Sequence, residues 1–110
     1  MTRTKTLPPK LPKVVFSVLG DVPVIMSDEL AEKAEAIGLI NFHNRKIAIQ
    51  TNLSRETMWP TLFHEMTHLA LNDSGTADVL TKKQEESVCN AMGLYLAAAV
   101  QAGYLKVILR

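Results

Sequence analysis

The sequence contains a single cysteine and no long apolar run. Because Cys89 has no partner within the chain, an internal disulfide is excluded, and a reducing compartment, the cytoplasm, is expected. The longest apolar stretch, residues 94–100, is far shorter than the roughly 18 residues needed to span a membrane. The basic N-terminus precedes a short, interrupted apolar run without a small-residue cleavage site, so a signal peptide is not expected.

The sequence also lacks an excess of charge of either sign. The 12 Lys and Arg residues and the 11 Asp and Glu residues leave a net charge of +1, which gives no reason to expect nucleic acid or membrane partners. A hydrophobic fraction of 47% with a charged fraction of 21% is typical of a soluble globular protein and excludes a disordered chain. A chain of 110 residues has room for one domain and none for a separate substrate domain.

The chain divides into a short arm and this one domain. Residues 1–13 combine basic residues and prolines with almost no apolar side chains, which predicts a flexible or extended arm. A solvated tail is the simpler interpretation of the arm, and contact with an acidic partner is the alternative. Residues 14–110 are expected to form the single domain.

The apolar pattern of this domain predicts an α+β fold, in which a small, mostly antiparallel sheet packs against two long helices. Pro60 is expected to kink the first long helix or to mark a later start, and Thr81 with Gln84 forms a capping box for the second. The expected elements are two strands around the Gly20-Asp21 turn within residues 13–25, a helix from Ser27 to Ile37, strands Leu39–Phe42 and Lys46–Gln50, helices from Ser54 to Leu71 and from Thr81 to Ala102, and a strand or packed tail at Tyr104–Leu109.

The most informative segment is His64-Glu65-Met66-Thr67-His68 in the first long helix. Because residues four apart lie on one helix face, the imidazoles of His64 and His68 can bind one zinc ion. Glu65 lies about 100° around the helix and can reach a metal-bound water without being a ligand. Both histidines lie away from the centre of the expected core face, which consists of Met58, Trp59, Leu62, Phe63, Met66, Leu69 and Ala70.

The second long helix offers a third zinc ligand. Glu86 and Asn90 share one face, and the small residues Gly93 and Ala97 continue it, so the two helices can approach closely. We expect Glu86 to bind the ion and Asn90 to hydrogen-bond a ligating imidazole. Glu85 is instead expected to be a solvated acid that stabilises the helix N-terminus. Cys89 is expected to be a small buried hydrophobe rather than a ligand.

The pattern His64-Glu65-x-x-His68 followed by Glu86-x-x-x-Asn90 resembles that of the gluzincin metallopeptidases, and it is similar to short zincin-like proteins of bacteria and phages and to the ImmA/IrrE group. This resemblance implies a zincin-like fold and one Zn2+ bound by His64, His68 and Glu86. It also implies hydrolysis of peptide bonds, with Glu65 as the general base for a metal-activated water. Asn90 stands where many relatives carry Asp.

The resemblance leaves two parts of the site open. An oxyanion donor is needed, and the candidates are Tyr104, Tyr95 and His43, although Tyr95 is also expected in the core. In the clan an edge strand pairs with an extended peptide or protein substrate. The natural candidate for that strand is the segment Lys46, Ile47, Ala48, Ile49 and Gln50.

Two alternatives to a zinc peptidase remain at this point. The same residues can form a zinc-stabilised binding or regulatory module of phage or bacterial origin without catalytic activity. They can also belong to a metal-free structural protein in which the motif is accidental. Whether the chain acts alone, as a dimer or with a partner subunit stays open.

Overall fold

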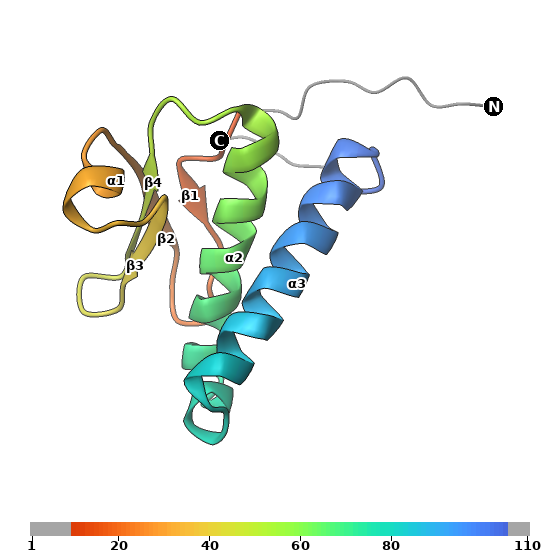
Figure 1. Ribbon diagram of the computed structural model, residues 1–110. Coiled ribbons are helices and arrows are strands. Elements are labelled where there is room, and N and C mark those ends of the chain that lie inside the picture. Colours follow the sequence, from red (N-terminus) through yellow and green to blue (C-terminus); the bar gives the residue numbers. More distant parts are fainter. Residues whose placement is uncertain (1–9, 106–110) are drawn as a thin grey trace.

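The computed structural model describes residues 10–105 and has an α+β fold. A small sheet lies on one side, and two long helices stack beside it in separate layers (Figure 1). No helix in the described range is long and apolar enough to cross a membrane. The elements are β1 (Val14–Val15), β2 (Val22–Ser27), α1 (Leu30–Lys33), β3 (Gly38–Asn41), β4 (Lys46–Gln50), α2 (Arg55–Asp73), the 3-10 helix η1 (Thr76–Val79) and α3 (Lys82–Gln101).

The four strands form one mixed sheet in the order β1-β2-β4-β3. The outer pairs β1–β2 and β3–β4 are antiparallel, but the central pair β2–β4 is parallel. The sheet is therefore antiparallel in its two outer pairs, as expected, but its parallel central pair makes it a mixed sheet. The reason is that the chain crosses from β2 through α1 to β3 and returns along β4, and such a crossover gives a parallel pair.

The position of β4 also differs from the prediction. Lys46–Gln50 is an interior strand between β2 and β3, so it cannot be the open edge for a substrate. The side chains of Ile47 and Ile49 in this strand are fully buried, as the alternation along Lys46–Gln50 predicted. The edge strand on this side of the sheet is β3.

The short helix α1 is smaller than expected. It covers only Leu30–Lys33, whereas Ser27 remains the last residue of β2. The Ser27 hydroxyl accepts a hydrogen bond from the Glu29 N–H, so it supports the turn before the helix rather than capping it. Glu35 adopts a left-handed conformation with φ 52°, which ends any helical continuation toward Ile37.

The two long helices follow the predicted boundaries closely. Helix α2 begins after Ser54, whose side chain accepts from the Thr57 N–H, and Pro60 lies inside the helix rather than at a later start. Helix α3 begins after the Thr81–Gln84 capping box. The expected tail begins with Tyr104 and Leu105, which are in no regular element, and its remainder lies outside the described residues, as do residues 1–9 of the arm.

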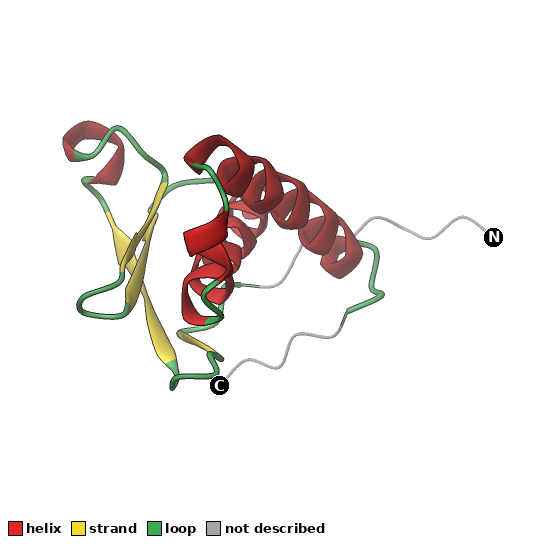
Figure 2. Ribbon diagram, turned by 90° about the horizontal axis from the view of Figure 1, so that it is seen from below, coloured by secondary structure: helices red, strands yellow, loops and turns green. Residues whose placement is uncertain are grey.

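Helix α2 is the central layer, with the sheet on one side and α3 on the other (Figure 2). Ala70 was expected on the core face of α2, but this prediction was wrong, because its side chain is exposed. Met58, Phe63 and Met66 are half-buried. The buried cluster consists of Val15, Val22, Ile47, Ile49, Trp59, Leu62, Leu69, Ala97 and Val100.

Candidate metal centre

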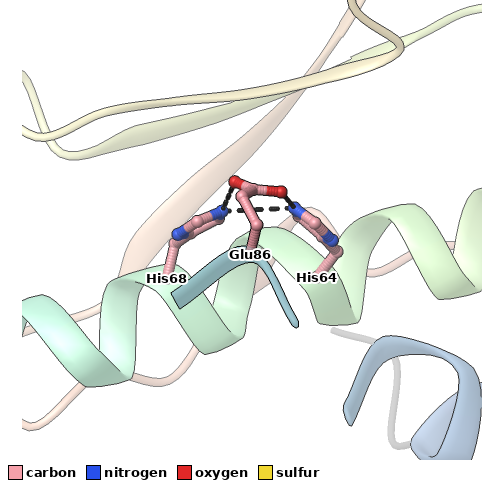
Figure 3. Close-up of side chains that lie close together, drawn as sticks. All are labelled: His64, His68 and Glu86. Atoms are coloured by element: carbon pink, nitrogen blue, oxygen red, sulfur yellow. Dashed lines mark hydrogen bonds and ion pairs between the residues drawn. The ribbon is translucent and has the colours of Figure 1, made fainter. Parts of the chain in front are cut away.

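Three side chains from the two long helices converge at one point, and we call His64, His68 and Glu86 the donor cluster (Figure 3). The Nε2 atoms of His64 and His68 lie 3.2 Å apart. The Glu86 carboxylate spans both, with its oxygens 3.3 Å from His64 Nε2 and 2.8 Å from His68 Nε2. One helix thus supplies two nitrogens and the next supplies the oxygens between them.

The donor cluster has the spacing and chemistry that a zinc ion requires. Ligand atoms about 2.0–2.1 Å from a tetrahedral ion lie about 3.3 Å from one another, close to the separations in the cluster. Two imidazole nitrogens and one carboxylate oxygen are common zinc ligands, and three protein ligands leave one position for water. The residues present could therefore hold a metal ion, and their chemistry fits zinc.

The close contact between the helices positions Glu86. Gly93 of α3 is buried against α2, and a Cβ atom added there would lie 2.8 Å from the carbonyl oxygen of Pro60 and 3.2 Å from the backbone nitrogen of His64. Ala97, one turn later, is also buried. The small residues on this face let α3 lie close enough to α2 for the carboxylate of Glu86 to reach both imidazoles.

Glu85 has a different position from the one expected. Its Oε2 atom lies 2.5 Å from Nδ1 of His68, and only 21% of its side chain is exposed. The sequence predicts a solvated acid at this position, because adjacent acids at a helix N-terminus give no sign of which one turns inward. Its contact with His68 is the main feature of the site that the sequence does not predict.

Asn90 does not take the role expected of it. Within residues 10–105 it makes no hydrogen bond to either histidine, and it is exposed. It lies instead beside a cavity of about 480 Å³ that we call the Glu65 cavity. This cavity is lined by Ile37, Gly38, Pro60, Thr61, His64, Glu65, Asn90 and Leu94.

Glu65 is the buried acid of this cavity, with 7% of its surface exposed. The pKa of Glu65 is raised to about 7, mainly by burial; His68 opposes this shift and the nearby Glu86 contributes to it. A bound divalent cation would lower this pKa again. Gly38 of β3 packs against the helix here, and a Cβ atom at that position would lie 2.6 Å from Cγ2 of Thr61. The edge strand thus passes directly beside Glu65.

None of the three candidate oxyanion donors lines the Glu65 cavity. Tyr95 is 71% exposed, so its expected place in the core was wrong, and Tyr104 is 79% exposed beyond the end of α3. His43 lies exposed in the turn between β3 and β4. In the part of the chain that the structure describes, the cavity has no tyrosine, lysine or arginine in its lining.

Cys89 is fully buried, as expected for a small apolar residue. The pKa of its thiol is raised to about 12, mainly by burial and in smaller part by the carboxylates of Glu85, Glu86 and Glu65. Its sulfur lies near His68 and Glu85 in a second group of possible ligand atoms. Because Cys89 is fully buried whereas His64 of the donor cluster lines the Glu65 cavity, the donor cluster is the more accessible of the two groups.

Comparison of the chain with protein-family models, with curated proteins and with solved structures found no match.

Proposed function

We propose that this protein is a zinc-dependent peptidase with a zincin-like active site. The observation that carries the proposal is that His64, His68 and Glu86 converge with the buried acid Glu65 beside them. A metal site with an open position next to a buried carboxylic acid is an arrangement suited to hydrolysis.

The roles of the residues follow from their positions. His64, His68 and Glu86 would hold the zinc ion, which supplies an activated water and polarises the carbonyl group of the substrate. Glu65 would take a proton from that water as it attacks the carbonyl carbon. The same carboxyl group would then give the proton to the leaving amine as the C–N bond breaks.

The open edge of β3 is the proposed place for the peptide. The Gln50 N–H donates to the carbonyl of Ile37, so by the alternation of an antiparallel pair Leu39 and Asn41 also bond toward β4. The backbone groups of Gly38 and Ile40 therefore face away from the sheet. An extended peptide that paired with them would lie beside Glu65.

Asn90 is the proposed polar contact for the substrate. Of the described residues that line the Glu65 cavity, Asn90 alone carries a side-chain amide. An amide N–H can donate to a carbonyl oxygen as negative charge develops on it.

A second function is favoured by the lining of the cavity. Among residues 10–105, that lining has no tyrosine, lysine or arginine, so stabilisation of the oxyanion by these residues would rest on Asn90 and the metal. A zinc-stabilised binding module without hydrolytic activity is the alternative consistent with this lining.

The first test combines metal analysis with three substitutions. We expect the protein to bind about one zinc ion per chain, and His64→Ala and Glu86→Ala to lose it, because each removes one of three ligands. Glu65→Gln should keep the ion but abolish cleavage of a broad peptide library, measured by mass spectrometry. Glu56→Gln provides the matched control, because this exposed acid lies in the first turn of the same helix.

The outcomes separate the two functions. Failure of the wild-type protein to take up zinc would contradict both of them. Zinc binding without cleavage of any library peptide, in wild type as in Glu65→Gln, would favour the binding module. Cleavage that survives Glu65→Gln would exclude this residue as the base.

A further inference from the structure

The two ring nitrogens of His68 face different carboxylates. Nε2 points to the donor cluster, 2.8 Å from Glu86 and 3.2 Å from Nε2 of His64. Nδ1 lies on the other side of the ring, 2.5 Å from Oε2 of Glu85. Glu85 therefore contacts the imidazole at the position that a metal ion on Nε2 leaves free.

We propose that Glu85 is the positioning residue of His68, which holds its Nε2 lone pair toward the metal. A carboxylate that accepts the Nδ1–H bond fixes the tautomer and the orientation of the ring, and it raises the basicity of the ligating nitrogen. The inference rests on metal binding by the donor cluster, the first part of the proposed function.

Stabilisation of the α3 N-terminus alone does not account for the position of Glu85. An acid in the first turn of a helix interacts favourably with the helix dipole while it remains in water. The side chain of Glu85 is 21% exposed, however, against 51% for its neighbour Glu86. A carboxylate withdrawn from water needs a hydrogen-bonding partner, and His68 is that partner.

Direct ligation by Glu85 is also disfavoured by the geometry. A carboxylate bonded to Nδ1 stands across the ring from the Nε2 atoms that converge on Glu86. Glu85 therefore acts on the site through His68 rather than as a fourth ligand.

The support is specific to one histidine. Among the described residues, Nδ1 of His64 has no hydrogen-bond partner, and Asn90, which was expected to provide one, does not contact it. The effect of Glu85 should therefore appear at His68 and leave His64 unchanged.

The test compares Glu85→Ala and Glu85→Gln in the full-length chain, with zinc as the probe. We expect Glu85→Ala to weaken zinc binding about 10- to 100-fold, the usual effect of losing such a partner. Glu85→Gln should recover part of the loss, because its side-chain oxygen still accepts from Nδ1–H. Asp78→Ala and Asp78→Asn are the matched controls, since they remove one exposed negative charge from η1.

A spectroscopic measurement distinguishes this role from a general effect on folding. In the zinc-loaded wild-type protein, the His68 Nδ1–H proton should give a downfield, slowly exchanging NMR signal, because it is bonded to a carboxylate. Glu85→Ala should lose this signal, whereas Asp78→Ala keeps it. His64, whose Nδ1 has no hydrogen-bond partner among the described residues, should give no such signal in any variant.

The results decide the proposal in either direction. If Glu85→Ala binds zinc as tightly as Asp78→Ala does, the proposal is wrong. If Glu85→Ala fails to fold, the comparison of Glu85→Gln with Asp78→Asn decides, and equal zinc affinity overturns the proposal. A wild-type protein that binds no zinc contradicts the proposed function instead, so the two failures are distinguishable.

Discussion

Asp73, the last residue of α2, joins three segments that are distant in the sequence. Its side chain is 2% exposed and accepts two hydrogen bonds from the Arg45 guanidinium, at 2.9 and 3.0 Å. The Ser17 hydroxyl donates to the same carboxylate at 2.6 Å and accepts from Arg45 at 2.8 Å. The network ties the end of α2 to the β1–β2 loop and to the β3–β4 turn.

The pH dependence of stability should report on this network. The Arg45 hydrogen bonds lower the pKa of Asp73 from 3.8 to about 2, so the folded protein holds this carboxylate ionised more strongly than the unfolded chain does. The resulting stabilisation is complete above pH 3.8 and is lost as the pH falls toward 2. We expect Asp73→Asn to lower the free energy of unfolding at pH 7 by about 1–3 kcal/mol. Urea unfolding should show this difference shrinking below pH 4.

The control for Asp73 is Asp78→Asn, which changes an exposed acid. Its free energy of unfolding should follow that of the wild-type protein at every pH. A difference between Asp73→Asn and the wild type that stays constant down to pH 2 would contradict the assignment.

At the scale of elements, the distance between α2 and α3 depends on Gly93. The atoms that a side chain there would meet are the backbone atoms of Pro60 and His64, which cannot rotate away. Any residue larger than glycine must therefore move one helix relative to the other. Because Glu86 and the histidines lie on opposite sides of this contact, such a movement changes the donor cluster.

We expect Gly93→Ala to weaken zinc binding and to destabilise the protein. Alanine favours a helix over glycine by about 1 kcal/mol, but overpacking a close contact costs about 1–3 kcal/mol, so the net change is unfavourable. Isothermal titration and thermal unfolding measure the two effects. Ser87→Ala is the control, since this exposed position of α3 gains helix propensity without a new contact. Zinc affinity unchanged in Gly93→Ala would contradict the proposed role of the contact.

Local features of the helices could be predicted from the sequence, whereas the order of the strands in the sheet could not. The capping box Thr81–Gln84 and the spacing of His64 and His68 are local, so helix geometry alone relates these residues to one another. The order of the strands depends on pairing between distant segments, and the alternation in Lys46–Gln50 predicts a buried face without identifying its neighbours.

The same distinction applies to the adjacent acids of α3. Glu85 and Glu86 differ by about 100° around the helix, but only the packing of α3 on α2 determines which ring nitrogen each one meets. The sequence therefore predicted a site of two histidines and a glutamate. The hydrogen bond to an imidazole was expected from Asn90, but the contact is made by Glu85.

In the whole molecule, α3 is an outer layer that packs mainly on α2 and has few contacts with the sheet (Figure 2). Opening of α3 as a unit would separate Glu86 from the two histidines. A zinc ion on the donor cluster would oppose this movement, because it binds groups on both helices. The metal ion is therefore expected to hold α3 against α2 in addition to its proposed role as a cofactor.

Hydrogen exchange can test this link. Free zinc at 100 times its dissociation constant stabilises the closed state by about 2.7 kcal/mol, so amide exchange that requires α3 to open should slow about 100-fold. If α3 opens as a unit, the slowing should extend to Val100, near the helix end remote from Glu86, while α1 should be unaffected because it opens without disturbing the site. In His64→Ala, zinc should change the amide exchange rate neither at Val100 nor in α1. Slowing confined to the first turns of α3 would show that this helix does not move as one body, and the zinc ion would then stabilise only the end of α3 that carries Glu86.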